Sequence, residues 1–313
     1  MEIARYSAGH EAEWNAFVDK SRNGTFLFNR AYMDYHSDRF ADHSLLLRHK
    51  GRLCALLPAN EADDTLWTHQ GLTYGGLVVS RDATTSLVCD MMESIKTYLH
   101  QQGFRRMVYK AVPWIYHSLP SEEALYALVN VLGAKLTVRH ISSTIDLSQP
   151  LGLTESRRSG LRKATSRGLR IKESGKDGIA AFWQVLESNL LEKYDAHPVH
   201  SAAEMRLLME RFPEHIRLYT VDDGQSVLGG TVLYLTTNVV HTQYISATGE
   251  GKRIGALDLL FDHLLRQEWH GRRFLDFGKS SDGDGHDLNR PLIFQKEGFG
   301  GRGVCYDWYE WTE

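Results

Sequence analysis

The order in which predicted helices and strands follow one another is nearly the same in the two halves of the chain. Each half opens with helices, passes through several β-type runs, and ends with a helix, a strand, a helix and a last strand. A polar break at 148–152 separates the halves, and the final strand, 303–311, carries alternating aromatic residues. Helices beside a mainly antiparallel sheet define the α+β class. We therefore predict an α+β fold of two tandem domains, residues 1–148 and 149–313. In chain order, the main predicted helices are 11–21, 30–36, 85–103, 121–134, 154–168, 178–194, 202–212, 256–269 and 287–299.

Length and composition support two ordinary globular domains. At about 100 to 200 residues per domain, 313 residues exceed one common core. Hydrophobic residues make up 42% and charged residues 24%, which excludes a disordered, collagenous or coiled-coil chain. No apolar run approaches the roughly 18 residues of a membrane span, and no secretory signal is visible. We expect a soluble, cytoplasmic protein.

Cysteine and histidine spacing gives no sign of a metal or disulfide framework. The 3 cysteines are scattered, as is typical of a reducing compartment, and none of the 15 histidines forms an HExxH-type pair. The formal charge of −3 excludes a polycation that coats nucleic acid, although local basic patches remain compatible with it. The prediction is therefore no metal site.

Polar and glycine residues concentrate in the segment 274–302. A strand there ends near Asp276 and is followed by a loop, where binding groups commonly lie. Lys296 stands one turn before a glycine-flanked phenylalanine, where it would hold an anionic substrate group or, alternatively, serve only the helix dipole. A plain surface connection is the alternative for the whole segment. Its candidate site residues are Asp276, Ser280, His286, Asn289 and Lys296.

The helix predicted over 154–168 is strongly basic. Arg158 and Arg162 are four residues apart and share a helix face, a spacing suited to clamping a phosphate or carboxylate. Nucleic acid is a second candidate anion, and a solvated charged face is the structural alternative.

A glycine-rich turn follows the strand that contains Gln243 and Tyr244 and opens a helix. Backbone N–H groups at such a helix start bind phosphate or pyrophosphate, which makes Gly251, Gly255 and Ala256 candidates for cofactor binding. Gln243 and Tyr244 would point into a cleft, or Tyr244 would belong to the core.

The motifs RSGLRKATSRGLRI, VHTQYISAT, FLDFGKSS and QKEGFGGR resemble those of the FemAB/FemX-like branch of the GNAT acyltransferase superfamily. The resemblance implies two tandem GNAT-like domains and transfer of an acyl or aminoacyl group to an amine of a cell-envelope saccharide or peptide precursor. It also implies acyl-CoA or charged tRNA as donor, with no tightly bound cofactor. Arg158 and Arg162 would then clamp substrate phosphate, Tyr244 would line the cleft and Lys296 would contact a substrate anion. The GNAT pyrophosphate loop is incomplete here, and the helical arm that some members use with tRNA has no counterpart.

Amine attack on a thioester or ester requires a free-base amine, a donor for the developing oxyanion and an acid for the leaving group. We expect Asp276 or His286 to accept the proton directly or through water, and a backbone N–H beside a β-bulge in the strand 244–247 to polarise the carbonyl. The alternative is that positioning alone supplies much of the rate, with no single indispensable base. An open V-shaped gap between strands would favour the pantetheine arm of acyl-CoA, whereas a closed sheet would favour a tRNA donor. The alternative hypothesis is a non-catalytic GNAT-fold module that binds a nucleotide-sugar or nucleic acid. The sequence leaves the acceptor and the oligomeric state open.

Overall fold

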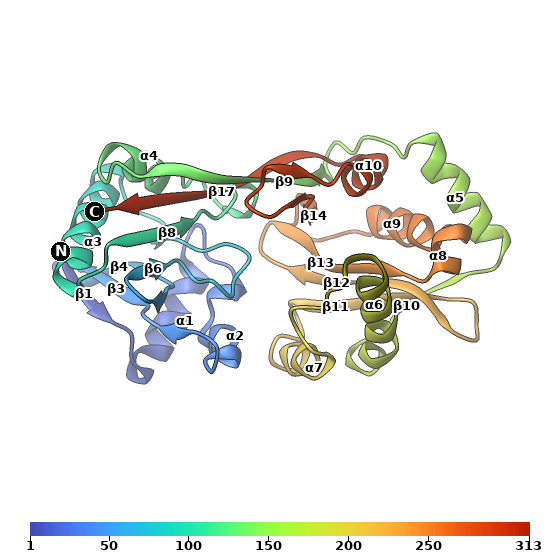
Figure 1. Cartoon of the computed structure of the whole chain (residues 1–313), viewed down its shortest axis with the longest axis horizontal. Coiled ribbons are helices and arrows are strands. Elements are labelled where there is room, and N and C mark those ends of the chain that lie inside the picture. The colour runs from blue at the N-terminus through green and yellow to red at the C-terminus, as the bar shows by residue number, and fades with distance from the viewer. The chain divides into compact units, whose positions relative to one another are not determined.

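The contacts within the chain divide it into two compact units that each draw on more than one segment. The computed structural model describes residues 1–313, the side chain at position 194 excepted. The first unit comprises Met1–Ile141, Ser281–Asp287 and Cys305–Glu313, and the second comprises Ser142–Ser280 and Leu288–Val304 (Figure 1). The predicted boundary at 148/149 placed Ser281–Asp287 and Cys305–Glu313 in the second domain. They join the first unit because the last strand pairs with a strand more than 190 residues earlier, Trp308 with Lys110 through Thr312 with Arg106.

The first unit is an α+β layer structure with two sets of hydrogen-bonded strands. One set has the order β1-β3-β4-β7, and the other contains β2, β5, β6, β8 and the end of β17. All the pairs are antiparallel except β6 with β8. The strands are β1 (Glu2–Arg5), β2 (Ala41–Asp42), β3 (Leu45–His49), β4 (Arg52–Leu57), β5 (Asn60–Ala62), β6 (Thr65–Trp67), β7 (Val78–Val79) and β8 (Arg106–Lys110), and the helices are α1 (Glu11–Lys20), α2 (Arg30–Met33), α3 (Thr85–Gln102) and α4 (Glu123–Asn130).

Two local details of this unit bear on the sequence predictions. The helix expected over 30–36 divides into α2 and a 3-10 turn, Asp34–His36, and β1 was not predicted. The glycine pair Gly75–Gly76 marks a close approach of the backbone to neighbouring groups. Gly76 has φ +92°, and a side chain there would clash with the ring of Tyr109.

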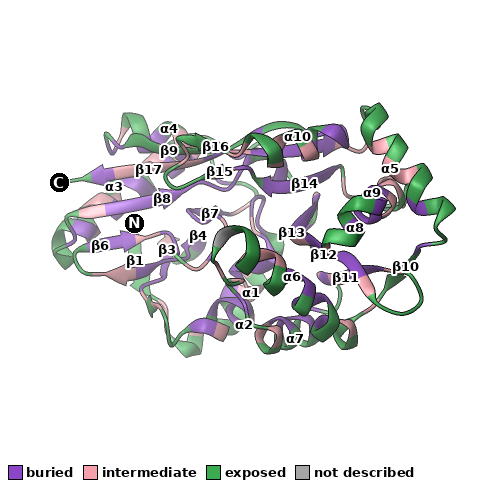
Figure 2. Cartoon of the chain, turned by 45° about the vertical axis from the view of Figure 1, so that its right-hand side comes forward, coloured by how far each residue is buried: buried purple, intermediate pink, exposed green. Residues whose placement is uncertain are grey.

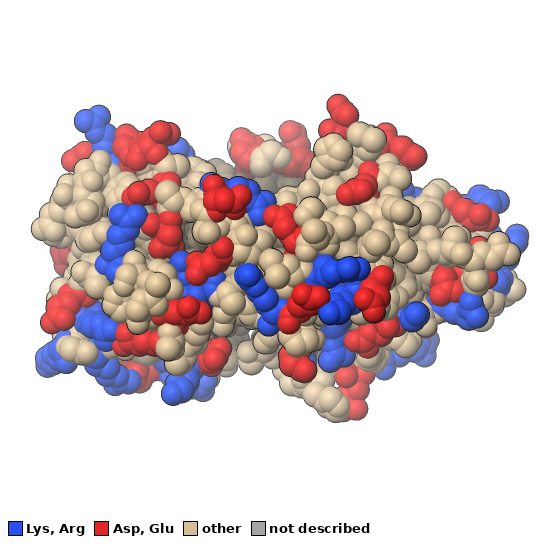
Figure 3. All heavy atoms as spheres, turned by 90° about the horizontal axis from the view of Figure 1, so that it is seen from below, with Lys and Arg blue, Asp and Glu red and all other residues tan. Residues whose placement is uncertain are grey.

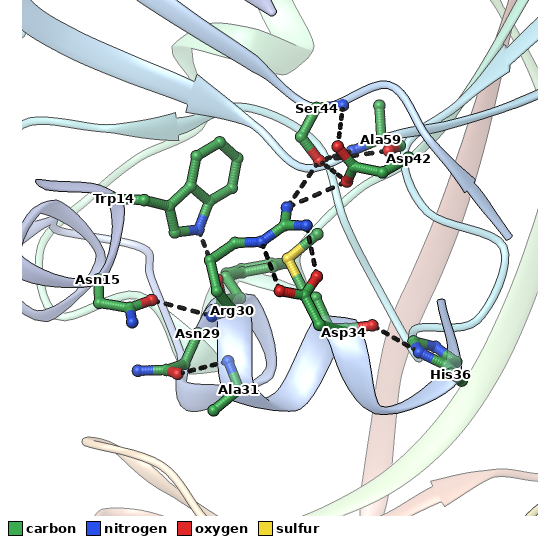
Figure 4. Close-up of polar contacts among 12 residues, drawn as sticks. Trp14, Asn15, Asn29, Arg30, Ala31, Asp34, His36, Asp42, Ser44 and Ala59 are labelled. Atoms are coloured by element: carbon green, nitrogen blue, oxygen red, sulfur yellow. Dashed lines mark hydrogen bonds and ion pairs between the residues drawn. The ribbon is translucent and has the colours of Figure 1, made fainter. Parts of the chain in front are cut away.

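A buried arginine ties several segments of the first unit together. Arg30 is 2% exposed and its guanidinium donates to Asp34 Oδ1 at 2.5 Å and to Asp42 Oδ1 at 3.0 Å (Figure 4). It also donates to Ser44 Oγ at 3.2 Å and lies 3.7 Å from the centroid of the Tyr6 ring. A buried guanidinium needs such partners because its charge is costly to desolvate. The cluster is therefore structural.

The second unit is a six-strand sheet with helices on both faces. Its order is β10-β11-β12-β13-β14-β9, antiparallel except for β13 with β14. The strands of the sheet are β9 (Lys135–Asp146, from Ser142 onward), β10 (Arg170–Glu173), β11 (Ile216–Asp222), β12 (Val227–Leu235), β13 (Val239–Ala247) and β14 (Phe274–Lys279). The helices are α5 (Glu155–Ser166), α6 (Ile179–Tyr194), α7 (Ala202–Arg211), α8 (Gly249–Ile254), α9 (Ala256–Arg266) and α10 (Arg290–Gly298). Three later strands, β15 (Ser281–Asp282), β16 (Asp287–Leu288) and β17 (Arg302–Thr312), lie wholly or partly in the first unit.

The apolar faces of α9 and α6 pack on opposite faces of this sheet. Leu260, Phe261 and Leu264 of α9 are fully buried in one core with strand residues, as the spacing in α9 predicted. On the other face, α6 approaches so closely that a side chain at Gly230 would meet the ring of Phe182. Figure 2 shows β12 to β14 as buried and much of α5 as exposed. A binding site can therefore form at the ends of the strands that lie between α6 and α9.

The surface carries both signs of charge. On the face shown in Figure 3, Lys and Arg side chains alternate with Asp and Glu side chains, in keeping with the near-neutral total. A search of the described residues finds no helix that is both long enough and apolar enough to cross a membrane.

Candidate active site in the second unit

The two parallel strands at the centre of the second unit pair only at their beginnings. β13 and β14 are in register from Val239 with Phe274 to His241 with Asp276, whereas β13 continues to Ala247. Beyond that point Ile245, Ser246 and Ala247 of β13 and Phe277 of β14 line a shared cavity. This is the open gap that the sequence analysis named as the feature favouring a donor with a long arm.

A β-bulge lies on β13 where the strands separate. The register with β12 shifts between Val232, opposite Tyr244, and Leu233, opposite Thr242, so that Gln243 is the extra residue. A bulge disrupts the ladder locally and leaves its extra residue unpaired. The Tyr244 carbonyl there accepts from Thr231 Oγ1 at 2.8 Å. The bulge therefore lies one residue before the stretch 244–247 in which it was expected, and two residues before Ile245, the first residue of β13 that lines the cavity.

The cavity has a volume of about 530 Å³ and an apolar floor. Phe261, Phe277 and Phe299 form an aromatic group in which ring centroids are 4.9 to 5.8 Å apart. A volume of this size falls in the range of small-molecule sites. The complete lining is Asn189, Leu190, Lys193, Ile245, Ser246, Ala247, Lys252, Leu257, Phe261, Phe277, Leu292, Gln295, Lys296 and Phe299.

Lys296 on α10 brings a buried amino group to the edge of the cavity. The residue is 5% exposed, and its Nζ donates to the carbonyl oxygens of Gly278 at 2.9 Å and Lys279 at 2.8 Å. Burial lowers the pKa of Lys296 to about 8, and the negative charge of Asp276 opposes that shift. An ammonium has three N–H donors, so two are used by the β14 carbonyls while the residue also lines the cavity. The side chain is thus oriented and held for hydrogen bonding to a ligand.

Two further lysines lie on the side of the cavity formed by α6 and α8. Lys252 of α8 donates through Nζ to the side-chain oxygen of Asn189 on α6, and Lys193 follows one turn later on α6. Both lysines are exposed, unlike Lys296. The cavity therefore has positive charge on two sides of an apolar floor.

Asp276 was predicted as a proton acceptor, and its surroundings argue against that role. Its side chain is 0% exposed and accepts hydrogen bonds from Ser142 Oγ at 2.5 Å and Thr144 Oγ1 at 2.7 Å on one oxygen. The other oxygen accepts from His241 Nδ1 at 2.9 Å and the Gly278 amide at 3.3 Å. With both oxygens occupied, the carboxylate joins β9, β13 and β14 below the point of separation. The geometry favours a positioning role.

His286 and Asn289 also have geometries that differ from the predicted ones. The His286 side chain is 81% exposed and lies 3.7 Å from Asp284, in a loop that belongs to the first unit. Asn289 caps α10, because its side-chain oxygen accepts from the Leu292 amide at 3.2 Å. Neither residue is among those that line the cavity. A role for His286 as proton acceptor finds no support in this geometry.

Tyr244 packs beneath α6. Its hydroxyl group lies 2.6 Å from His200 Nδ1, its ring meets Trp183 edge to face at 5.2 Å, and burial raises the pKa of Tyr244 to about 12. Tyr244 is half-buried, and neither it nor the bulge residue Gln243 is among the residues that line the cavity, so their role in a cleft stays a prediction.

The predicted arginine clamp on α5 is already engaged. Arg158 and Arg162 are exposed and both pair with Glu155, at 3.0 and 2.8 Å. The arginine that reaches inward is Arg157, which donates to Asp258 Oδ1 at 2.8 Å and lies 5.4 Å from the ring centroid of Phe299. Substrate binding by Arg158 and Arg162 stays a prediction. A bound substrate would have to replace Glu155 as the partner of both arginines, and this exchange would reduce its affinity.

The glycine-rich turn is shaped by helix packing. A side chain at Gly251 would clash with the Leu228 carbonyl, and one at Gly255, which has φ +85°, would clash with the Gly160 carbonyl of α5. Ala256, fully buried, begins α9. The cavity lining includes none of these three residues, although it includes Lys252 between them. Their predicted cofactor binding stays a prediction.

Several buried polar atoms around β13 and β14 have no hydrogen-bond partner within the described part of the chain. They are Ser143 Oγ, Thr242 Oγ1, Gln243 Oε1 and Ser280 Oγ. Ser143 lies beside Gly301 near the Lys296 carbonyl, and Ser280 follows the carbonyl that holds Lys296 Nζ. Buried polar groups are normally paired, so these atoms are left to bind water or a ligand, and none of the four residues is among those that line the cavity. The prediction for Ser280 is compatible with this position.

Among the residues described, no three His, Cys, Asp or Glu side chains gather as metal ligands.

Comparison with known proteins agrees with this geometry. Residues 155–286 match the model of the acetyltransferase (GNAT) domain family. The solved structure of FemX superposes with a TM-score of 0.69 at 12% identity, covering 100% of this chain and 98% of that one. None of the curated proteins compared with the chain matches it in sequence.

Two more solved structures share the arrangement. The C-terminal domain of a putative lysylphosphatidylglycerol synthetase from Agrobacterium fabrum gives a TM-score of 0.61 at 12% identity, over 97% of this chain and 92% of that one. A tandem GNAT protein from the clavulanic acid biosynthesis pathway gives 0.52 at 13% identity, over 99% and 98%. At such identities the likeness establishes the fold.

The fold, the splayed strands and the domain match define the class: this is an N-acyltransferase of the GNAT type, and its second unit belongs to the GNAT acetyltransferase domain family. Within that class the chain has the tandem architecture of FemX, and the predicted resemblance to the FemAB/FemX-like branch is confirmed. The predicted α+β fold of two GNAT-like halves is confirmed with it.

The residues that the sequence analysis missed come from elements distant from the C-terminal motifs. Asn189 and Lys193 belong to α6, whose pattern indicated only an amphipathic helix, and Lys252 was passed over for the glycines beside it. The three phenylalanines of the floor looked like ordinary core. A signal existed only for Phe299, which stands in the glycine-flanked motif after Lys296.

Proposed function

We propose that the protein transfers an acyl or aminoacyl group from acyl-CoA or charged tRNA to an amine of a cell-envelope saccharide or peptide precursor, at the cavity of the second unit. The observation that carries this proposal is the cavity at the separation of β13 and β14, which the buried Lys296 helps to line. FemX and the C-terminal domain of the putative lysylphosphatidylglycerol synthetase share the fold. The name of the second protein describes the attachment of an amino acid to a lipid, which is a reaction of the proposed class.

The proposed reaction needs little from the protein beyond positioning and charge stabilisation. The acceptor amine, as the free base, attacks the acyl carbon; the C–N bond forms and the C–S or C–O bond to the carrier breaks. The attacking nitrogen gives up one proton, and the leaving thiolate or alkoxide takes up one proton, with water carrying the proton from one to the other. No carboxylate or imidazole is among the residues that line the cavity. Holding the two reactants together supplies a large part of the rate in such reactions.

Lys296 would stabilise the oxyanion that develops on the acyl carbonyl. Its Nζ is fixed by the Gly278 and Lys279 carbonyls, so that it needs no reorganisation when charge appears. The bulge at Gln243 offers a backbone N–H as a second donor. The orphaned hydroxyl groups of Thr242 and Ser280 would receive polar groups of the acceptor or carrier.

The alternative of a non-catalytic module bound to a nucleotide-sugar or nucleic acid rested on the basic helix. Arg158 and Arg162 share one acidic partner, Glu155, which halves the positive charge available there. The alternative therefore has less support than transfer at the cavity.

The test is to incubate the full chain with acyl-CoA or aminoacyl-tRNA separately, each with a panel of amino sugars, nucleotide-linked amino sugars and peptides. Product is followed by mass spectrometry together with release of thiol or of uncharged tRNA. Lys296→Met should lower kcat about 100-fold or more, the loss measured when one oxyanion donor is removed. Lys172→Met, an exposed lysine on β10, is the control and should leave the rate unchanged. Absence of transfer from both donors to every acceptor, or full activity of the Lys296 variant, would contradict the proposal.

A further inference from the structure

We infer that the acyl group accepted by the cavity is uncharged and apolar, a linear or aromatic acyl group longer than acetyl, rather than an aminoacyl group with a free ammonium. This inference rests on the proposed function, because it assigns the cavity of the second unit to the acyl group. The evidence for this inference is the chemical character of the side chains that line the cavity, because these side chains determine which groups the cavity can stabilise.

The lining is apolar over most of its residues. Leu190, Ile245, Ala247, Leu257 and Leu292 join the three phenylalanines, so eight of the fourteen lining residues are aliphatic or aromatic. Phe261 and Phe299 are 0% and 1% exposed, and Phe277 is 3% exposed. A rigid floor of this kind stabilises methylene or ring carbons by removing them from water.

The charged side chains of the lining are all basic. They are Lys193, Lys252 and Lys296, and the lining contains no Asp or Glu. A cationic group inside the cavity would lose its hydration without gaining a counter-ion, and it would face the ammonium of Lys296. The α-ammonium of an aminoacyl ester and the side chain of a lysyl or arginyl group are cations of this kind. A neutral acyl group meets no such penalty.

The positive side of the cavity suits the carrier of the acyl group. Phosphate groups are present in both CoA and tRNA, and lysine ammonium groups attract them as point charges. Lys193 comes from α6 and Lys252 from α8, whereas Lys296 comes from α10, and all three are among the residues that line the cavity. The arrangement therefore divides the site into a neutral pocket for the acyl group and a cationic side for the carrier.

Calorimetric titration of the full chain with a graded set of acyl-CoA thioesters tests the inference. Affinity should rise from acetyl- through butanoyl- and hexanoyl- to octanoyl-CoA, about fourfold for each methylene that enters the cavity. β-Alanyl-CoA has the same number of heavy atoms in its acyl group as butanoyl-CoA but ends in an ammonium, and it should bind at least tenfold more weakly. For the tRNA carrier, N-acetyl-leucyl-tRNA should bind more tightly than leucyl-tRNA.

Two variants connect the selectivity to the cavity. Leu190→Trp narrows the pocket and should remove the gain in affinity from acetyl- to octanoyl-CoA, whereas Leu191→Trp, at the 53% exposed next residue of α6, should keep that gain. Gln295→Glu places a carboxylate in the lining and should reduce the preference for butanoyl- over β-alanyl-CoA.

The outcomes separate the two proposals. Binding of neither carrier would contradict the proposed function and this inference with it. Binding of acyl-CoA with no dependence on chain length, equal affinity for butanoyl- and β-alanyl-CoA, or tighter binding of leucyl-tRNA than of its N-acetyl form would overturn the inference alone. If Leu190→Trp and Leu191→Trp behave alike, the acyl group lies elsewhere, and the inference is also wrong.

Discussion

Replacing Asp276 by asparagine separates a positioning carboxylate from a catalytic one. Asp276 accepts four hydrogen bonds, two on Oδ1 from Ser142 and Thr144 and two on Oδ2 from His241 and the Gly278 amide. Asparagine keeps the shape of the side chain and one carbonyl oxygen. Its amide nitrogen can face the two hydroxyl groups, which rotate to accept, while its oxygen keeps the contacts with His241 and Gly278.

The expected cost follows from the change of each bond from charged to neutral. Hydrogen bonds to charged groups contribute about 1.5–3 kcal/mol and neutral ones about 0.5–1.5 kcal/mol, so four bonds that each weaken by about 1 kcal/mol lose about 4 kcal/mol. The amide avoids part of the cost of burying a carboxylate, which offsets some of that loss. We expect Asp276→Asn to lower the free energy of unfolding by about 2–3 kcal/mol.

Urea denaturation, followed by circular dichroism, measures this change as a lower midpoint at an unchanged slope. Asp284→Asn is the matched control, because its side chain is 65% exposed in the loop at 283–286, and it should change stability by less than about 0.5 kcal/mol. Activity per folded molecule of Asp276→Asn should stay within about tenfold of the parent. An unshifted midpoint would refute the hydrogen-bond argument. A 100-fold loss of kcat in the folded variant, with loss of the acidic limb of the pH profile, would restore Asp276 as the proton acceptor.

Three more predictions follow from single contacts. Arg30→Met removes the buried partner of Asp34 and Asp42, whose side chains are 43% and 29% exposed, and should destabilise the protein by about 1.5–3 kcal/mol in urea denaturation, whereas Arg52→Met, at an exposed ion pair, should cost under about 1 kcal/mol. Gly255→Ala combines a positive φ with a clash against α5 and should lower the melting temperature clearly, while Gly249→Ala, which has open space, should not; equal melting temperatures would contradict the packing role. The pKa of Lys296 is lowered to about 8, so if its ammonium serves the reaction, kcat should be retained below that pH and fall tenfold per pH unit above it; a rate that still rises at pH 9 would exclude the ammonium.

The reason why a prediction from the sequence agrees with the structure differs from one element to the next. The stripe of Leu260, Phe261 and Leu264 identified α9, since helical periodicity is a local property that packing then uses. Lys296 was identified by a motif in which a lysine precedes a glycine-flanked phenylalanine, and both residues line the cavity. The segment predicted as a glycine-rich turn is mostly the short helix α8, and only Gly255, with φ +85°, breaks the chain before α9, where it contacts α5.

The sequence by itself determined the kinds and order of most elements and one lysine of the cavity lining, and the resemblance of its motifs implied the tandem GNAT-like fold. Those features follow from spacing within one helix, one strand or one motif. Only the tertiary structure decided that Asp276 is enclosed by donors from β9 and β13, that the final strand completes the first unit, and that α6 and α8 supply Lys193 and Lys252 to the cavity. The physical reason is that burial, pairing of distant strands and the charge of a cavity depend on residues far apart in the chain, and local patterns do not specify which of them meet.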